Sequence, residues 1–184
     1  NEWSTMKATL KAAKEAEKAR LVITPLTVGC VDLDMISLFP RKTFKGRKNG
    51  LRADLAQVIA DMKPKFVRFP GGCAAHGNGL DNMYLWKRTI GKLEERQHMP
   101  NIWNYHQTLG LGYYEYFLFC EDIGAEPLPV IPAAVPCQNS WRGGHGQQGG
   151  VPMEEMDNFI QDILDLIEWA NGDAKTTKWG RVRA

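Results

Sequence analysis

The segment KFVRFPGGCAAHGNG, residues 65–79, begins with strand-favouring residues and then breaks into glycines and polar residues. A single arginine, Arg68, lies within the apolar run, and Gly71 and Gly72 follow soon after it. A strand that ends in a flexible, polar turn usually presents a functional group at that end. The segment therefore predicts a strand over residues 65–70 whose carboxyl end contributes to a site.

The segments around this strand have the spacing of helices. Residues 49–64 (NGLRADLAQVIADMKP) place their leucine, valine, isoleucine and methionine side chains on one helical face and stop at Pro64. Residues 110–124 (GLGYYEYFLFCEDIG) repeat the pattern after a long polar and aromatic loop, and Gly124 is a typical C-terminal cap. Each segment predicts a helix.

The same cycle of strand, loop and helix then repeats. Residues 126–134 (EPLPVIPAA) form a short, almost wholly apolar run, as in a parallel strand that is buried on both faces. After a glycine-rich loop, residues 152–171 predict a helix that begins at a proline and ends before a glycine. Alternating helices and strands predict βα units around a parallel sheet, and hence an α/β fold.

The lengths of the connections indicate where a site lies. The two loops that follow the strands are long, whereas the turns from helix to strand, KPK and GAE, are short. α/β folds place their sites at the carboxyl ends of parallel strands. We therefore expect the loop after Arg68 and the loop after Ala134 to lie on the same functional face.

The N-terminal part of the chain has a different pattern. The second half of residues 20–40 (RLVITPLTVGCVDLDMISLFP) alternates apolar and acidic side chains, which is typical of a strand with one wet face. Residues 6–20 favour a helix by intrinsic propensity, so the element type stays open there. The change of pattern near Phe44 predicts a domain boundary, with residues 41–50 as the linker.

Composition excludes several classes of protein. The chain of 184 residues has a net charge of +2 and scattered basic residues, which argues against a nucleic-acid partner. No apolar run approaches the ~18 residues of a membrane span, and the first residues contain no signal-peptide core. The chain does not open with methionine, so we expect a piece of a longer protein.

The sequence predicts neither a metal nor a cofactor. The four cysteines contain no C-x-x-C pair, and His76, His106 and His145 lack the helical H-x-x-x-H spacing of a zinc site. GGCAAHGNG does not match the G-x-G-x-x-G spacing of a dinucleotide-binding loop, and RGGHGQQGG lacks the lysine of a phosphate-binding loop. We interpret both glycine-rich segments as flexible loops.

Residues 68–96 (RFPGGCAAHGNGLDNMYLWKRTIGKLEER) and 101–130 (NIWNYHQTLGLGYYEYFLFCEDIGAEPLPV) resemble the α-L-arabinofuranosidases of glycoside hydrolase family 51. The resemblance runs from about Ala19 to the last residue. It rests on three features that occur together and in order: a strand ending in R-F-P-G-G, a tryptophan–lysine pair before I-G, and an E-D-I-G-A-E-P turn.

The resemblance implies a (β/α)8 TIM barrel into which a small β-sandwich module is spliced. Residues 1–44 would be the last strands of this carbohydrate-binding-like sandwich and the start of the linker. Residues 45–184 would be the N-terminal part of the barrel, which is partial because a complete barrel needs roughly 250 residues. Within the sandwich, the resemblance implies strands over residues 5–12 (TMKATLKA) and 19–26 (ARLVITPL).

The family's chemistry implies hydrolysis of terminal non-reducing α-L-arabinofuranosyl groups from plant polysaccharides. The anomeric configuration would be retained, with one glutamate as acid/base and a second as nucleophile. The expected partner is an arabinofuranosyl-containing oligo- or polysaccharide, and the expected enzyme is extracellular or periplasmic, with a homo-oligomer left open. No G-N-E, the family's acid/base signature, occurs here, and the nucleophile is missing too, so the chain would be inactive alone. The alternative is a non-catalytic carbohydrate-binding or interaction module, which a G-N-E soon after Ala184 in the parent reading frame would exclude.

The resemblance assigns substrate-binding roles to Arg68, Gly71, Gly72, Cys73 and Trp86. Arg68 would point its guanidinium into the sugar pocket or hold a neighbouring carboxylate; the alternative is a structural ion pair under the sheet. The glycines would let the backbone approach the furanose, and Cys73, where many relatives have asparagine, would contact the ring. Trp86 would stack on the sugar beyond the cleaved bond, or else anchor the core.

The remaining aromatic and acidic residues are lesser candidates. Trp103 and Trp141 are further candidates for stacking on a sugar. Glu94 and Glu95 are expected to be solvated in a loop, and Glu115 lies in the first turn of a helix, where the helix dipole alone favours a carboxylate. We therefore expect half of a site in this chain, with groups that bind but no catalytic pair.

Overall fold

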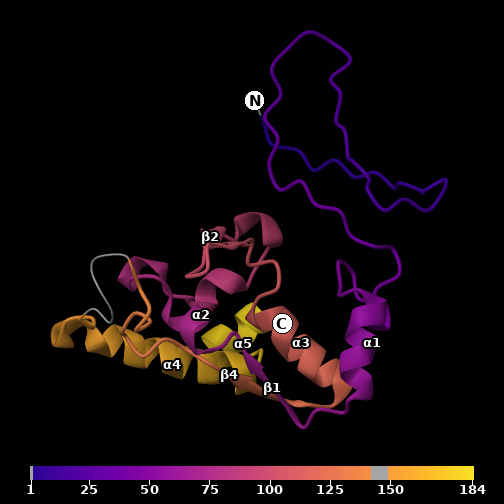
Figure 1. Ribbon diagram of the computed structural model, residues 1–184. Coiled ribbons are helices and arrows are strands. Elements are labelled where there is room, and N and C mark those ends of the chain that lie inside the picture. Colours follow the sequence, from indigo (N-terminus) through magenta and orange to yellow (C-terminus); the bar gives the residue numbers. More distant parts are fainter. Residues whose placement is uncertain (1, 142–148) are drawn as a thin grey trace. The chain divides into compact units, whose positions relative to one another are not determined.

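The structure, a computed structural model, describes residues 2–141 and 149–184 (Figure 1). The chain divides into two units, Asn1–Leu33 and Asp34–Ala184, and each is described by itself. Of the first unit, residues 2–33 contain no helix and no strand, and all of these residues are exposed.

The strands expected over residues 5–12 and 19–26 are absent from this structure. A strand is stable only when neighbouring strands pair its backbone and cover its apolar side chains, and an isolated pair is marginal in water. Residues 2–33 offer no such cover, since Leu26, for example, is 94% exposed. The helix that propensity favours over residues 6–20 is absent for a related reason, because a short helix without packing is also marginal.

The second unit alternates helices and strands, as the sequence predicts. In chain order, with η denoting a 3-10 helix, its elements are η1 (Phe44–Gly46), α1 (Ala53–Asp61), β1 (Phe66–Phe69), α2 (Gly72–His76), η2 (Leu80–Asn82), η3 (Trp86–Thr89), η4 (Leu93–Glu95), β2 (Met99–Pro100), β3 (His106–Gln107), α3 (Tyr113–Ile123), β4 (Glu126–Pro129), η5 (Met153–Glu155), α4 (Met156–Asn171) and α5 (Lys178–Arg183). Helices α1, α3 and α4 and strands β1 and β4 lie within the predicted ranges. Gly124 ends α3 with a φ of +68°, which confirms its predicted role as a cap.

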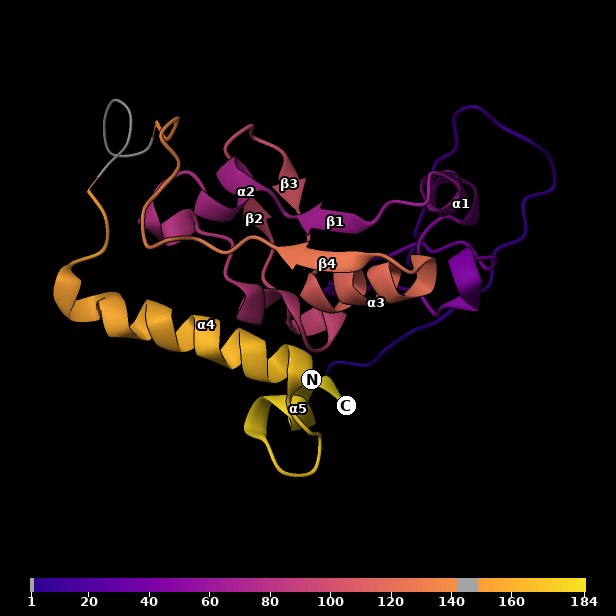
Figure 2. The same cartoon turned by 90° about the horizontal axis from the view of Figure 1, so that it is seen from below.

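Strands β1 and β4 pair in parallel, with Arg68 opposite Leu128 and Phe69 opposite Pro129. Helix α3 connects the two strands along the chain and packs against both (Figure 2). Parallel strands joined through a helix are the repeating unit of α/β folds, so the predicted fold class is confirmed at this level. The described residues contain one such pair, a fraction of the eight strands of a TIM barrel.

The long loop predicted over residues 71–108 contains local structure that periodicity did not reveal. It holds α2, three 3-10 helices and the antiparallel pair of β2 and β3. Asparagine side chains replace missing backbone partners here: Asn82 Nδ2 donates to Pro100 O at 2.9 Å, and Asn101 Oδ1 accepts from Tyr105 N at 3.0 Å. Such local side-chain bonds stabilise turns, which have no repeating hydrophobic pattern.

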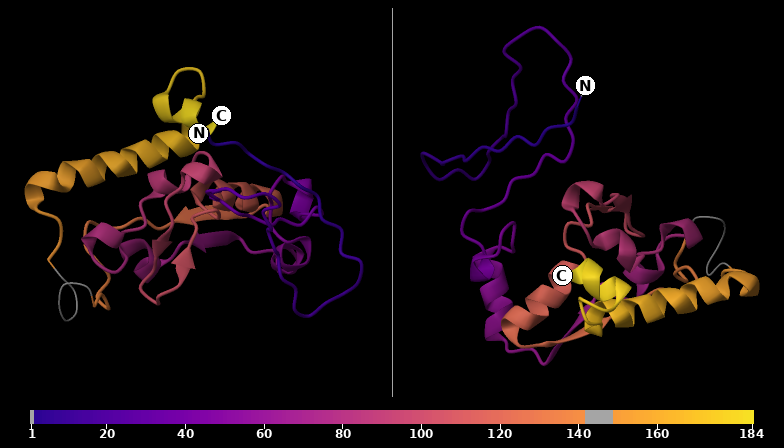
Figure 3. Two further views of the ribbon diagram at one scale, coloured as in Figure 1. Left: turned by 90° about the horizontal axis from the view of Figure 1, so that it is seen from above. Right: turned by 180° about the vertical axis from the view of Figure 1, so that it is seen from behind.

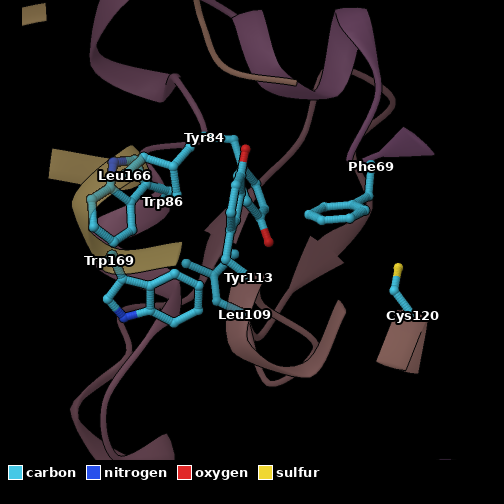
Figure 4. Close-up of a cluster of buried hydrophobic side chains, with 8 residues drawn as sticks. All are labelled: Phe69, Tyr84, Trp86, Leu109, Tyr113, Cys120, Leu166 and Trp169. Atoms are coloured by element: carbon cyan, nitrogen blue, oxygen red, sulfur yellow. The ribbon is translucent and has the colours of Figure 1, made fainter. Parts of the chain in front are cut away.

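The main core gathers aromatic rings from elements that are far apart in the sequence (Figure 4). Phe69 of β1 stacks on Tyr116 of α3, with ring centroids 4.5 Å apart, and meets Tyr113 edge to face at 5.4 Å. Helix α4 contributes Trp169, which meets Phe117 edge to face at 5.3 Å. The buried members are Phe69, Tyr84, Trp86, Leu109, Tyr113, Cys120, Leu166 and Trp169.

Helix α1 packs through a small cluster of Phe44, Ala56 and Phe119. The apolar face that periodicity gives this helix is open instead: Val58 is 62% and Met62 is 68% exposed. The described residues provide nothing that covers this face. Helix α1 is therefore an amphipathic helix whose apolar side has no partner in the described chain.

The C-terminal helices also combine packing with an open face. In both views of Figure 3, α5 folds back against the end of α4, and Arg183 fixes this turn by donating to Trp169 O at 2.8 Å and Gly172 O at 3.0 Å. On α4, Leu164 is 52% and Ile167 is 55% exposed. Among the described residues, no helix has the length and apolar character that a bilayer crossing requires.

Candidate functional site

The loops that follow β1 and β4 lie against each other at the carboxyl ends of these parallel strands. His76 Nδ1 lies 2.6 Å from Val135 O, and Cys137 N donates to Gly77 O at 3.2 Å. These bonds confirm the prediction that the loop after Arg68 and the loop beyond Ala134 share one face. They bring residues of both loops together at one end of the paired strands.

Asn78 strengthens the connection between the two loops. Its Oδ1 accepts from Ser140 Oγ at 3.1 Å and from Trp141 N at 3.0 Å. Asn78 and Ser140 are both buried, at 4% and 2% exposed, so water competes little for these bonds. No local pattern indicates this pairing, because the partners lie more than a helix and a strand apart in the chain.

Arg68 lies at the carboxyl end of β1 with its side chain exposed. An added Cβ on Gly71 would lie 3.7 Å from Arg68 Nη1, and one on Gly72 would lie 3.7 Å from Nη2. The guanidinium therefore rests beside the bare backbone of both glycines. Gly71 has a φ of +110°, which side-chain-bearing residues rarely adopt, so glycine is required at this turn.

Arg68 forms no ion pair with any residue in the described part of the chain. The alternative of a structural ion pair under the sheet is therefore absent among these residues. An unpaired guanidinium offers a planar set of donors that suits a carboxylate or a row of hydroxyl groups. Arg68 is therefore a candidate binding group.

Cys73 lies in the first turn of α2, directly after the glycine turn, and is partly buried. The neighbouring thiol of Cys137 in the other loop, and then burial, raise the pKa of Cys73. Cys137 is 1% exposed. Cys73 was predicted as a site residue, whereas Cys137 was not. The only signal for Cys137 in the sequence is its position in the loop after the second strand.

Trp86 lies in the core rather than at the strand-end loops. It is 1% exposed, and its ring meets Trp169 at 5.9 Å (Figure 4) and Trp179 at 5.2 Å between centroids. Its Nε1 donates to Asp162 O at 3.1 Å. Because other rings cover its face, Trp86 offers no open surface to a sugar among the described residues, and the predicted stacking role stays a prediction. The alternative, a core anchor, holds because α4 and α5 supply the covering rings.

Lys87 fastens the same loop to α4. Its Nζ lies 2.9 Å from Asp162 Oδ1, forms a second ion pair with Asp165, and sits 4.8 Å from the ring centre of Trp179. Burial lowers the pKa of Lys87, but the hydrogen bonds that Lys87 donates to Asp165 and Asp162 outweigh it and raise the pKa overall. The tryptophan–lysine pair is thus a structural clamp in this chain.

Of the lesser tryptophan candidates, Trp141 is the one that the structure brings to the site. Its ring is 61% exposed while its backbone nitrogen is held by Asn78. Trp103 is 53% exposed but lies in the turn between β2 and β3. Trp141 therefore presents an open indole face beside the strand-end loops, as carbohydrate sites require.

The acidic candidates are engaged or remote from this cluster. The Glu115 carboxylate accepts two bonds from the buried guanidinium of Arg96, each 2.9 Å long, and a third of 2.9 Å from Gly112 N. Glu94 and Glu95 are exposed, as expected. Glu115 thus caps the N-terminus of α3, where the helix dipole favours its carboxylate as predicted. It also forms an ion pair with the buried Arg96.

Metal-binding side chains do not gather in the described residues. Within residues 2–141 and 149–184, no three histidine, cysteine, aspartate or glutamate side chains come together as a metal site. His145 and most of the glycine-rich segment RGGHGQQGG lie outside the described residues. The described groups at the strand ends are a guanidinium, an imidazole, two thiols and an exposed indole.

Comparison with known proteins gives a consistent match. A sequence model of the family described as "Alpha-L-arabinofuranosidase 1 domain" matches residues 58–184. The extracellular exo-α-L-arabinofuranosidase of Streptomyces chartreusis is 48% identical over 194 aligned residues, covering 99% of this chain and 22% of that protein. α-L-Arabinofuranosidase 1 of Arabidopsis thaliana is 40% identical over 185 residues, covering 100% of this chain and 25% of that protein.

Solved structures agree with the sequence match. The arabinose-bound MgGH51 α-L-arabinofuranosidase superposes with a TM-score of 0.68 at 35% identity, covering 77% of this chain and 21% of that one. The Thermotoga maritima α-L-arabinofuranosidase, at 23% identity and a TM-score of 0.52, supports the likeness in fold alone. The chain spans a quarter or less of the length of each of these proteins.

Proposed function

Because this chain belongs to the α-L-arabinofuranosidases of glycoside hydrolase family 51, we propose that its parent protein removes terminal non-reducing α-L-arabinofuranosyl groups from arabinose-containing plant polysaccharides. The observation that carries this proposal is the match of residues 58–184 to the family, together with 48% identity to an arabinofuranosidase over 99% of the chain. Configuration is retained in the proposed reaction, and no cofactor takes part.

The proposed architecture is a partial (β/α)8 barrel in residues 45–184, preceded in residues 1–44 by the end of a β-sandwich module. The parallel pairing of β1 and β4 through α3 supports the barrel, because that is its repeating unit. The open apolar faces of α1 and α4 support it too, since helices of a complete barrel are covered by their neighbours and by further strands. The sandwich assignment rests on the resemblance alone.

Arg68 is the proposed anchor for the sugar or for a catalytic carboxylate beside it. Its guanidinium is exposed, unpaired in the described chain, and set beside the backbone of Gly71 and Gly72. The missing side chains of the two glycines leave room for a furanose ring next to these donors. Cys73 borders the same space, and Trp141 is proposed in place of Trp86 as the stacking surface.

The hydrolysis itself needs two carboxyl groups about 5–5.5 Å apart, one as acid/base and one as nucleophile. No G-N-E occurs in this chain, and Glu115 is committed to Arg96. We therefore assign both catalytic glutamates to the rest of the parent protein and the first binding groups to this chain. The isolated chain is inactive under this proposal.

The proposed setting is outside the cytoplasm, in the extracellular space or the periplasm. Its support is the Streptomyces chartreusis relative, which is named an extracellular enzyme. An arabinofuranosyl-containing oligo- or polysaccharide is the proposed partner, and a homo-oligomer stays a prediction.

The test of the proposed site is Arg68→Ala in the full-length protein, with Arg88→Ala as a matched control at an exposed position on η3. One charged hydrogen bond contributes about 1.5–3 kcal/mol, so kcat/KM on an aryl α-L-arabinofuranoside should fall roughly 10- to 150-fold. The melting temperature should stay near that of the control. A collapse in melting temperature with unchanged activity per folded molecule would mean that Arg68 is structural, and sugar binding without any hydrolysis by the unaltered protein would favour the binding-module alternative.

A further inference from the structure

Two cysteines lie where the loops that follow β1 and β4 meet. Cys73 lies in α2 after the first strand, and Cys137 lies in the loop after the second. Cys73 is partly buried and Cys137 is 1% exposed. Cys137 raises the pKa of Cys73, so the two side chains lie near each other although 63 residues separate them in the chain.

A single residue, Gly77, ties the backbones of both cysteines together. Gly77 N donates to Cys73 O at 3.0 Å, and Gly77 O accepts from Cys137 N at 3.2 Å. Gly77 has a φ of +71°, and a Cβ there would lie 2.0 Å from Asn82 O, so this position is tightly fixed. The backbones of the two cysteines are therefore held close together by the fold.

Hydrogen bonds of residues near Cys73 and Cys137 also hold the two loops together. His76, three residues after Cys73, bonds Val135 O, two residues before Cys137. On the other side Ser140 N donates to Cys137 O at 2.8 Å, and Ser140 Oγ bonds Asn78. A disulfide needs two Cβ atoms about 3.5–4.5 Å apart with suitable direction, and backbones that are bonded through a shared residue favour such a link.

We propose that Cys73 and Cys137 form a reversible disulfide that links the two strand-end loops. The oxidant is a small-molecule disulfide such as oxidised glutathione. The thiolate of one cysteine attacks it, forming a mixed disulfide and releasing one small thiol; the second cysteine thiolate then displaces the other small thiol. The two protein thiols lose two electrons and two protons in total, and the small disulfide is reduced to two small thiols.

The bond would act on the loops that form the candidate site. Cys73 follows Gly71 and Gly72, so the link would restrain the glycine turn beside Arg68. Cys137 lies in the loop that carries Trp141, so the same link would restrain the exposed indole. Oxidation thus sets how far the two loops can separate, and reduction releases them.

The test measures the disulfide directly in the full-length protein and needs no enzymatic activity, so it stands apart from the proposed hydrolase function. The protein is reduced, transferred to oxidised glutathione, alkylated and digested with trypsin and a glutamate-specific protease. Cleavage after Glu121 separates Cys120 from Cys137. The expected product is residues 69–87 joined to residues 122–142, lost again on treatment with dithiothreitol.

Matched variants complete the test. Cys120→Ser should leave the cross-link intact, because Cys120 lies on α3 in the core, whereas Cys73→Ser and Cys137→Ser should each abolish it. In the unaltered protein the two thiols should disappear together as the glutathione ratio is made more oxidising. Separate glutathione adducts on Cys73 and Cys137, or two thiols that stay free while the small disulfide is in excess, would overturn the proposal.

Discussion

Replacing Trp86 should reduce stability far more than it reduces catalysis by folded molecules. The side chain is 1% exposed and meets Trp169 and Trp179 at 5.9 and 5.2 Å between ring centroids. Truncation of a buried tryptophan to alanine costs about 3–5 kcal/mol. Trp86→Phe keeps one ring but loses the Nε1 bond to Asp162 O and part of the stacking, each about 0.5–1.5 kcal/mol, so its expected cost is about 1–3 kcal/mol.

The assay is urea unfolding of the full-length protein, followed by circular dichroism, beside kcat/KM corrected for the folded fraction. Trp103→Phe is the matched control, because that indole is 53% exposed and should lose less than about 0.5 kcal/mol. If Trp86→Phe left the unfolding midpoint unchanged but lowered kcat/KM, the indole would be stacking on substrate. The core assignment would then be wrong, and the role implied by the family resemblance would be restored.

Three further outcomes follow from the described contacts. Glu115→Gln should destabilise the full-length protein by about 2–3 kcal/mol in urea unfolding, because the Arg96 side chain, 3% exposed, loses its charged partner. The control Glu95→Gln, in the exposed pair with Lys92, should cost less than about 1 kcal/mol. The raised pKa of Cys73 keeps its thiolate scarce at neutral pH, so cross-linking should accelerate with rising pH to beyond the ordinary thiol pKa; a rate that levels off below pH 8 would contradict this. The isolated 184-residue chain should self-associate in size-exclusion chromatography and release no arabinose, because the apolar faces of α1 and α4 are open; a monomer with hydrolase activity would refute this.

The regular elements of the second unit could be predicted from sequence because their signals are local. The spacing of apolar residues, Pro64, and the cap at Gly124 locate α1, β1 and α3 within a few residues. The shared face of the two strand-end loops also followed from a local observation, namely that the loops after strands are long and the turns before them short. Parallel pairing then places both loops at one end of the sheet.

The contacts between distant residues could not be predicted in this way. The burial of Trp86 depends on Trp169 and Trp179, which lie on helices far along the chain. The proximity of Cys73 and Cys137 depends on the backbone of Gly77, which bonds to both residues, and leaves no pattern in either segment. Side-chain roles that tertiary contacts create are therefore the part of the site that only the structure provides.

In the N-terminal unit, strands that the resemblance implied do not form in this structure. Residues 5–12 and 19–26 resemble strands of a sandwich, yet a strand forms only where neighbours pair and cover it. Residues 2–33 contain no such neighbours, and the apolar side chains stay exposed. A family resemblance predicts these strands as parts of a complete sheet. The other strands of that sheet would supply the pairing and the cover that make them stable.

The most direct test of the proposed function is the configuration of the first sugar released by the full-length protein. Proton NMR recorded during the first minutes of hydrolysis of an aryl α-L-arabinofuranoside, before the anomers equilibrate, identifies the initial product. A retaining arabinofuranosidase with two glutamates gives α-L-arabinofuranose first. Initial release of the β anomer would contradict retention, and the absence of any release by the folded, full-length protein would contradict the proposed activity.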